Sequence, residues 1–288
     1  MVAHDLPESA FRIVPIKTTG DRVQDRSLRE IGGKGLFTRE IEDALLDQMI
    51  DIAVHSMKDM PVLQPDDLVI DCYLPREDPR DAFVSLTCAG IADLPQGAVV
   101  GSSSLRRRAQ VALRRPDLHL VEFRGNVQTR LLKLREGVAA ATFLAMAGLN
   151  RLGMKDIAGN PISPDDMLPA VAQGAIGIER RVDDAVVAGL LADIHDHDTG
   201  LRLAAERAYL ARLDGSCETP IAGLAELTAE GLHLRGEILR PDGSEVLRGE
   251  RRGPARDAVA LGRALADELL SQAAPDFFCE AAAQARIT

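Results

Sequence analysis

The chain has 288 residues, of which 46% are hydrophobic and 27% charged, and its formal net charge is −10. This length allows two or three domains with their own cores, and the acidic balance argues against general binding to nucleic acid. No apolar run is long enough to cross a bilayer, and the first residues have neither the basic nor the apolar region of a secretory signal.

The four cysteines are Cys72, Cys88, Cys217 and Cys279. They are far apart, and no pair has the spacing of a metal site or of a CxxC motif. Widely spaced thiols are typical of a reducing compartment. We therefore expect a cytoplasmic protein that holds no metal ion.

The first part of the chain predicts alternating strands and helices. Strands are predicted where apolar residues cluster or alternate, at residues 11–17, 50–56 and 68–74. A glycine-rich loop covers 32–37, and Thr38 comes directly before a predicted helix. The apolar face of this helix consists of Ile41, Ala44, Leu45 and Met49. The polar stretch 75–83, which contains two prolines, predicts an exposed linker.

The second part repeats the pattern. Apolar segments that predict strands or buried crossings lie at 98–101, 118–123, 139–149 and 168–179. Ser102, Ser103 and Ser104 are N-cap candidates for a helix that stops at Pro116, and Asn126 opens another that ends at Gly137. The apolar faces of these helices carry Leu105, Ala109 and Ala112, and Val127, Leu131 and Leu134, respectively. Such alternation favours mostly parallel sheets covered by helices.

From Thr199 the pattern changes. A helix over 200–213 leads to a tight polar loop at 214–220, and three strand candidates follow at 221–227, 231–239 and 245–252. The Pro-Asp-Gly sequence at 241–243 is a strong hairpin signal. A last amphipathic helix closes this part, which predicts a small α+β domain.

The stretch from Gly101 to Arg135 is strongly basic. It holds nine Lys/Arg residues against two acidic ones in a chain that is acidic overall, and this segregation favours a focused positive site. Arg106 and Arg107 would lie in the first turn of a helix, where backbone N–H groups favour anions. Arg124 would begin the next helix, with Arg130 on its exposed side. The pattern indicates a carboxylate or phosphate pocket, but charge alone fits two solvated amphipathic helices equally well.

Lys58 and Asp59 lie where a predicted strand runs out into a loop. Ligand sites gather at such strand ends in α/β sheets, so Asp59 is a candidate acid/base and electrostatic group. A salt-bridged turn explains the same two residues without any function. His55, within the strand, fits a satisfied buried histidine better than a catalyst.

Cys217 lies in a tight loop between Gly215 and Pro220. A thiol on such a loop is a candidate nucleophile or covalent attachment point, although an incidental surface cysteine is the alternative. The other three cysteines are interpreted as packing or helix residues. The glycine run at 32–35 is neither a Walker A nor a GxGxxG sequence and fits a mobile loop better than a phosphate cradle.

Seven segments together resemble the porphobilinogen deaminase (hydroxymethylbilane synthase) family. In chain order they are GGKGLFTREIE, DIAVHSMKDMP, REDPRDAF, GSSSLRRRAQ, FRGNVQTRL, LPAVAQGAIGIE and GSCETPIAG. The resemblance implies two periplasmic-binding-protein-like α/β domains, with mixed sheets covered by helices, plus a small C-terminal α+β domain. The implied boundaries are 1–74 with 175–196, 80–170, and 197–288.

The implied activity is that of a transferase of tetrapyrrole and haem biosynthesis. It condenses four porphobilinogen molecules head to tail onto a covalent dipyrromethane cofactor, releases ammonia each time and yields hydroxymethylbilane. The cofactor is attached by a thioether to the residue that matches Cys217, and Asp59 matches the catalytic carboxylate. The resemblance further implies a monomer whose partner is a small-molecule substrate, with no nucleic acid and no membrane.

The resemblance also assigns the remaining site residues. Those that match groups binding the cofactor's acetate and propionate arms are Lys58, Ser104, Arg106 and Arg107. Those that match groups lining the space for substrate and growing chain are Ser103, Arg124, Asn126, Arg130, Arg151 and Gln173. Lys34 and Phe37 match the loop thought to cover the cleft. An arginine-lined cleft would suit a chain that gains carboxylates with each addition.

One departure concerns the start. The family's first strand and part of its first helix, with an Arg-x-Ser-x-Leu-Ala-type motif, have no counterpart here, so we expect a misassigned start and a longer natural protein. A truncated inactive homologue is the alternative. Two other classes of protein are less favoured alternatives: a non-catalytic carboxylate-binding protein of the periplasmic-receptor type, and a nucleic-acid-binding protein that uses the basic stretch.

Overall fold

The computed structural model describes residues 7–18, 38–157, 161–213 and 220–278. The chain forms two compact units, each built from two stretches of sequence. Unit 1 comprises residues 1–76 and 175–200, and unit 2 comprises residues 77–174 and 201–288. The three-domain division inferred from the sequence stays a prediction.

Unit 1 is built on a sheet with the strand order β1-β7-β2. The strands are β1 (Ala53–Ser56), β2 (Leu68–Tyr73) and β7 (Ile176–Arg181). Both outer strands pair antiparallel with β7, so the expected parallel arrangement is wrong here. The alternation of strands and helices in the sequence does not indicate this antiparallel pairing, because β7 comes from far along the chain and inserts between two strands that are close in sequence.

Helices cover both faces of this sheet. On one face, Leu45 of α3 (Arg39–Leu46) packs with Ala53 and Leu68. On the other, Leu191 of α7 (Ala185–Ala192) packs with Cys72 and Ile178. The central strand is thereby buried on both sides, which is the environment in which a charged side chain needs a partner.

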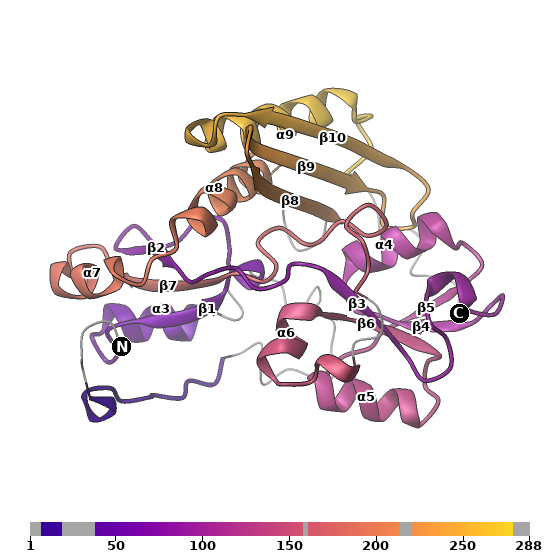
Figure 1. Cartoon of the computed structure of the whole chain (residues 1–288), viewed down its shortest axis with the longest axis horizontal. Coiled ribbons are helices and arrows are strands. Elements are labelled where there is room, and N and C mark those ends of the chain that lie inside the picture. The colour runs from indigo at the N-terminus through magenta and orange to yellow at the C-terminus, as the bar shows by residue number, and fades with distance from the viewer. Residues whose placement is uncertain (1–6, 19–37, 158–160, 214–219, 279–288) are drawn as a thin grey trace. The chain divides into compact units, whose positions relative to one another are not determined.

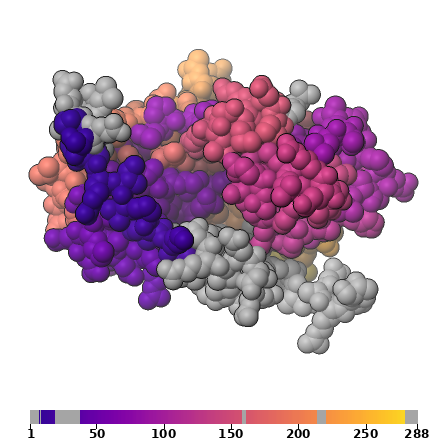
Figure 2. Space-filling model, turned by 90° about the horizontal axis from the view of Figure 1, so that it is seen from below, coloured from indigo at the N-terminus to yellow at the C-terminus, as the bar shows by residue number. Residues whose placement is uncertain are grey.

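Two expectations for this unit are wrong. Residues 11–18 form no strand and lie mostly at the surface, in the indigo region of Figure 2. Apolar alternation alone does not make a strand, because the backbone groups need a neighbouring strand to bond to. Met49 lies beyond the end of α3 and is 63% exposed, so it does not extend the buried face of that helix.

Unit 2 contains a mixed sheet with the order β3-β6-β4-β5. Its strands are β3 (Asp81–Ser85), β4 (Val99–Gly101), β5 (His119–Val121) and β6 (Ala141–Ala145). Strand β4 runs parallel to β5 and β6, whereas β3 runs antiparallel to β6. The helices of this region are α4 (Leu105–Arg114), α5 (Val127–Arg135) and α6 (Met146–Arg151).

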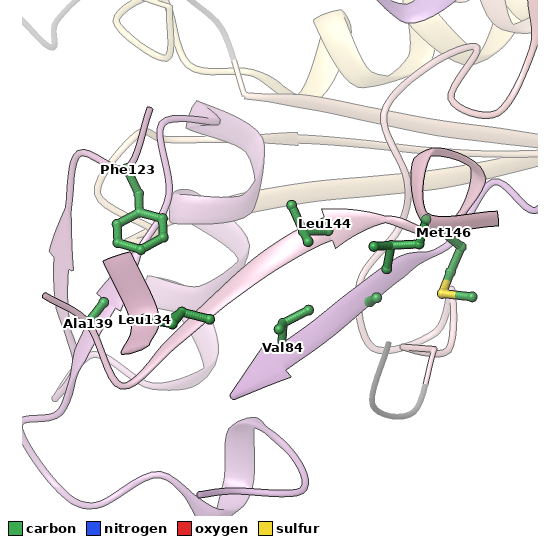
Figure 3. Packing of buried hydrophobic residues seen from close by; sticks show 8 residues of the cluster. Val84, Phe123, Leu134, Ala139, Leu144 and Met146 are labelled. Carbon is green, nitrogen blue, oxygen red and sulfur yellow. The ribbon is translucent and has the colours of Figure 1, made fainter. Parts of the chain in front are cut away.

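Two apolar cores flank this sheet because neighbouring strand residues point to opposite faces. Val84 and Leu144 pack on one face with Phe123, Leu134 and Met146, as Figure 3 shows. On the other face the rings of Phe83 and Phe143 meet edge to face with their centroids 6.0 Å apart. The first core seats α5 and α6, and the second receives Val111 from α4.

The predicted helix starts in this region are confirmed. Ser104 caps α4 by accepting a hydrogen bond from the backbone N–H of Arg107, and Asn126 caps α5 through the N–H of Thr129. Each cap satisfies a backbone donor that the helix itself leaves unpaired. Gly137 follows α5 with a φ of 73°, the left-handed conformation expected beyond a helix end.

The C-terminal part of unit 2 is an antiparallel sheet of three strands in the order β10-β9-β8, with helix α9 running along it (Figure 1). The elements are β8 (Ile221–Thr228), β9 (Gly231–Leu239), β10 (Val246–Gly253) and α9 (Ala258–Gln272). Helix α8 (His197–Arg212) begins in the last residues of unit 1 and continues into this part. The predicted hairpin is confirmed, with Gly243 at a φ of 75°. Leu265 and Leu269 of α9 are fully buried.

Short 3-10 turns complete the described chain, at Glu8–Ala10, Met57–Asp59, Ile91–Asp93, Lys155–Ile157 and Ala255–Asp257. Among the described residues, no helix is both long and apolar enough to cross a membrane. The second of these turns holds the predicted catalytic residue.

Candidate active site

Asp59 lies in unit 1, at the end of the 3-10 turn Met57–Asp59 that follows β1. Lys58 and Asp59 are both exposed, while Met57 before them is buried. Asp59 lines an open pocket of about 290 Å³ together with Thr38, Val54, His55, Ser56 and Met60. The predicted position of Asp59 just beyond a strand end is therefore confirmed, and its carboxylate is accessible to a ligand.

His55, two residues from the turn, is paired with a buried carboxylate. Its Nε2 lies 2.8 Å from Oε2 of Glu179 on β7, and the two side chains are 6% and 0% exposed. This agrees with the expectation of a satisfied buried histidine. Glu42 of α3 lies nearby: burial is the main cause that raises its pKa, and the charge of Glu179 raises it further.

In unit 2 the first-turn arginines of α4 share one buried carboxylate. Oδ1 of Asp81 accepts hydrogen bonds from Nε and Nη2 of Arg107, at 3.0 and 2.6 Å. Nη2 of Arg106 lies 2.8 Å from the other oxygen. Burial alone would raise the pKa of Asp81, but the two arginine charges and a hydrogen bond from Gln173 outweigh it, and the pKa falls to about 2.

The same cluster continues to the C-terminal sheet. Oε1 of Gln110 accepts from Nη1 of Arg106 at 3.0 Å, and its Nε2 donates to Glu237 of β9 at 2.9 Å. Arg248 donates to the other oxygen of Glu237 at 2.7 Å. Gln110 is completely buried, so the buried side of α4 includes polar side chains.

Sequence reasoning missed this network in two ways. Asp81 belongs to a polar stretch interpreted as an exposed linker, yet it is fully buried and begins β3. Gln110 lies four residues after Arg106, a spacing that places both on one side of a helix. That spacing was the only available signal, because an apolar pattern cannot indicate a buried polar side.

The serines before α4 hold the loop that enters this helix. Oγ of Ser102 accepts from the N–H of Ser104 at 3.3 Å, and Oγ of Ser103 accepts from the N–H of Phe123 at 2.9 Å. Ser103 therefore ties the start of α4 to the segment that leads into α5. This bond fixes the spacing between the two predicted helix starts.

Arg124 and Arg130 flank the start of α5. Nε of Arg124 lies 3.8 Å from the exposed carboxylate of Glu122, and Nε of Arg130 donates to the carbonyl of Gly125 at 2.9 Å. Arg130 is half-buried rather than on an exposed face. Burial, and next the charge of Arg107, lower the pKa of Arg130.

Arg151 and Gln173 lie where the chain leaves unit 2. Nη2 of Arg151 donates to the carbonyl of Gly174 at 2.8 Å, and Nε2 of Gln173 donates to the carbonyl of Pro79 at 2.7 Å. Gln173 also bonds to Asp81 at 3.1 Å. The bonds of Gln173 link the beginning and the end of the unit's first stretch, and the bond of Arg151 ties α6 to its end.

Arginine side chains gather near the start of α4. The charges of Arg106 and Arg107 both act on Asp81, and the charge of Arg107 acts on Arg130. The charge of Glu237 acts on Arg106 as well. Nε of Arg106 is buried without a hydrogen-bond partner. This donor set fits a ligand that carries several carboxylates.

Three predicted residues lie outside the described residues: Cys217, Lys34 and Phe37. Among the residues that are described, no group of three or more His, Cys, Asp or Glu side chains is arranged to hold a metal ion. That Asp59, the arginines and Cys217 line one cleft stays a prediction.

The comparisons with known proteins account for nearly the whole chain. Residues 1–189 match the model of the porphobilinogen deaminase dipyrromethane cofactor-binding domain, and residues 201–271 match that of the porphobilinogen deaminase C-terminal domain. The matches define an enzyme with a cofactor-binding domain and a separate C-terminal domain.

The relatives narrow this class to one family. Porphobilinogen deaminase of Paracoccus denitrificans (strain Pd 1222) is 73% identical over 278 residues, which cover 96% of this chain and 89% of that protein. The chloroplastic porphobilinogen deaminase of Pisum sativum is 53% identical over 275 residues, which cover 94% and 74% of the two chains. The chain belongs to the porphobilinogen deaminase family. The predicted enzyme class, hydroxymethylbilane synthase of tetrapyrrole biosynthesis, and the predicted dipyrromethane cofactor are confirmed.

Solved structures show weaker likeness. A methionine-binding lipoprotein of Bacillus subtilis is 14% identical with a TM-score of 0.37, over 56% of this chain and 76% of that chain. A sulfonate-binding protein of Methylobacillus flagellatus is 14% identical with a TM-score of 0.35, over 61% and 54%. The predicted fold class, α/β with mixed sheets and a C-terminal α+β part, is confirmed by the sheets themselves and by the family match.

Proposed function

We propose that this chain condenses four porphobilinogen molecules head to tail on a dipyrromethane primer held by Cys217, with Asp59 as the catalytic carboxylate. Each addition releases ammonia, and hydrolysis finally yields hydroxymethylbilane. The observation that carries the proposal is the accessible carboxylate of Asp59 in the pocket beyond β1. Family membership supplies the reaction.

Asp59 suits the electrostatic task that this reaction sets. Positive charge develops on a pyrrole ring when ammonia departs, and pyrrole N–H groups are hydrogen-bond donors. An ionised carboxylate held at the end of a strand accepts such bonds and stabilises such charge. Lys58, its neighbour in the turn, supplies a positive charge for a carboxylate of the bound chain.

The arginines suit the charge of a growing polypyrrole. Each porphobilinogen unit brings two carboxylates, and a charge-assisted hydrogen bond to one of them contributes about 1.5–3 kcal/mol where water is excluded. Arg130 is the strongest candidate because it is half-buried, lies near the charge of Arg107 and forms no ion pair among the described residues. Arg106 and Arg107 would act in part by fixing the α4 terminus through Asp81.

The cofactor, when bound, supplies the pyrrole carbon to which the first substrate is joined. Cys217 would hold it through a thioether. Ser104, with the first turn of α4, would bind its carboxylates through hydroxyl and backbone N–H donors. Ser103, Arg124, Asn126, Arg151 and Gln173 would position substrate and chain, and Lys34 and Phe37 would cover them.

The protein would work in the cytoplasm as a monomer, without nucleic acid. The acidic net charge of the chain supports the last point. Arg106, Arg107 and Arg115 of the basic stretch also form ion pairs within the fold, so their charges are not free for a phosphate backbone.

The intact mass of the purified protein tests the attachment of the cofactor. The expected mass exceeds that of the polypeptide by one dipyrromethane unit, and the adduct maps to the peptide that contains Cys217. Cys217→Ala should have the mass of the bare polypeptide and no turnover, whereas Cys72→Ala should keep the adduct because Cys72 is buried and packs inside unit 1.

A wild-type protein with the bare mass, a freely alkylated Cys217 and no turnover after incubation with porphobilinogen would contradict the proposal. An adduct on any other cysteine would contradict the assignment of Cys217 while leaving the reaction intact.

A further inference from the structure

The turn that carries Asp59 is only three residues long, Met57–Asp59. Its one internal backbone bond joins the N–H of Met60 to the carbonyl of Met57 at 3.4 Å, which is long. The pairing of β1 with β7 ends just before the turn, at Ser56, which is paired with Ile176. The turn leaves directly from the end of β1, so the contacts that β7 makes with this end contribute to the position of Asp59.

Two contacts hold that end through the residues next to the turn. The N–H of Met57 donates to the carbonyl of Ala175 at 3.1 Å, just before β7 begins. The side chain of Met57 lies across the backbone of Gly177, where an added Cβ would overlap its Sδ atom. Only glycine at this position lets Met57 pack so closely.

The third contact is the pair of His55 and Glu179. His55 is the residue of β1 that faces inward closest to the turn, and it reaches a fully buried carboxylate on the central strand at 2.8 Å. Burying that carboxylate costs free energy, because one of its oxygens, Oε1, has no hydrogen-bond partner. An apolar residue would fill the site without this cost, so packing alone does not explain a glutamate here.

His55 also lines the same pocket as Asp59. The bond to Glu179 fixes the orientation of the imidazole ring, in the way that a carboxylate fixes a histidine in many enzyme sites. A ring fixed in this way holds its own backbone, from which the turn leaves. The constraint thus passes from β7 through His55 to the residue that meets the substrate.

We infer that Glu179, acting through His55, is a positioning residue for Asp59. The inference rests on the proposed function, because it assumes that Asp59 is the catalytic carboxylate. Displacing a reacting group by a fraction of an ångström lowers the chemical rate far more than it lowers binding. Loss of Glu179 should therefore reduce kcat and leave KM and cofactor loading nearly unchanged.

The test compares Glu179→Ala with Glu179→Gln in the full chain. Glu179→Ala should lower kcat by about tenfold or more, with KM within about twofold and the adduct mass of the wild type. Glu179→Gln can still bond to His55 and should stay within about threefold of the wild type. Glu42→Gln is the matched control, since it removes a nearby carboxylate that forms no bond to His55, and its kcat should not change.

A double-mutant cycle with Asp59→Asn shows whether the effect runs through Asp59. Glu179→Ala should cost nothing further once Asp59 has been replaced. An equal loss in both backgrounds would overturn the inference, as would a loss confined to KM or an unchanged kcat in folded, loaded Glu179→Ala. Near-normal turnover of Asp59→Asn alone would instead contradict the proposed role of Asp59.

If Glu179→Ala does not fold, as judged by its thermal unfolding midpoint, the pair is tested from its other side. His55→Gln keeps a donor within reach of Glu179, whereas His55→Phe keeps the ring volume without the donor. The inference expects His55→Gln to retain most of the kcat that His55→Phe loses. Equal kcat in the two folded variants would overturn it.

Discussion

Two aspartates of this chain lie in opposite surroundings. Asp59 is exposed on a short turn, at the edge of a pocket, next to a lysine in sequence. Asp81 is fully buried between Arg106 and Arg107, with a pKa of about 2. Asp59 ends the turn that follows β1, and Asp81 is the first residue of β3.

The comparison separates a carboxylate proposed to serve chemistry from one that is engaged within the fold. Asp81 has its charge satisfied inside the protein and has no accessible surface for a ligand, so its work is to hold two arginines in place. Asp59 keeps an accessible carboxylate, which is what a reacting group needs. A residue's type does not decide between the two roles; its partners and its exposure do.

Replacing Asp81 should have the largest effect on stability. In Asp81→Ala two buried guanidinium groups lose their counter-ion, and the free energy of unfolding should fall by about 3–5 kcal/mol. Urea unfolding at neutral pH measures this. The matched control is Asp117→Ala, which breaks an aspartate–arginine pair of similar length whose side chains are 27% and 22% exposed, and it should change stability less because this pair is not fully buried. Similar losses in both variants would mean that the burial of Asp81 is irrelevant.

Lowering the pH should also reduce the free energy of unfolding through Asp81, by less than the Asp81→Ala substitution does. Because folding lowers the pKa of Asp81 from its usual 3.8 to about 2, its contribution to stability is complete above pH 4 and is lost as the pH falls toward 2. A shift of this size corresponds to about 2 kcal/mol. Unfolding of wild type and Asp81→Asn between pH 5 and pH 2.5 measures it. The stability difference between the two should narrow as the pH falls, and a constant difference would contradict the assignment.

Arg130 should show the smallest effect of the three, on substrate rather than on stability. Arg130→Gln removes a half-buried charge without breaking an ion pair among the described residues, so KM for porphobilinogen should rise about tenfold while the unfolding midpoint changes little. Arg135→Gln on the same helix is the control, since Arg135 is exposed at the helix end. An unchanged KM in Arg130→Gln would remove Arg130 from the substrate site.

Local rules predicted a good part of this fold. The three serines at 102–104 were predicted to include a helix cap, and Asn126 was predicted to open a helix, because short oxygen-bearing side chains satisfy free N–H groups at helix starts. The hairpin at Gly243 followed from turn chemistry that needs a positive φ. Each of these features is determined by a few residues that are adjacent in sequence, so it can be predicted from the sequence alone.

The features that were missed depend on partners distant in sequence. Residues 11–17 have the alternation of a strand, but pairing decides whether a strand forms. Asp81 and Gln110 are residue types that usually lie at the surface. The fold brings Arg106 to Asp81 and Glu237 to Gln110, which allows both to be buried. Asp59 was found because family motifs mark it, and residue type alone favoured a salt-bridged turn.

The most direct test of the account is the turnover of Asp59→Asn with its cofactor attached. Asparagine keeps the size of the side chain and removes the charge, so the variant should fold, carry the wild-type adduct mass and lose about 100-fold or more in kcat. Asp51→Asn, another exposed aspartate of unit 1, should turn over as the wild type does. Near-normal turnover of loaded Asp59→Asn would contradict the central claim that this exposed carboxylate performs the chemistry.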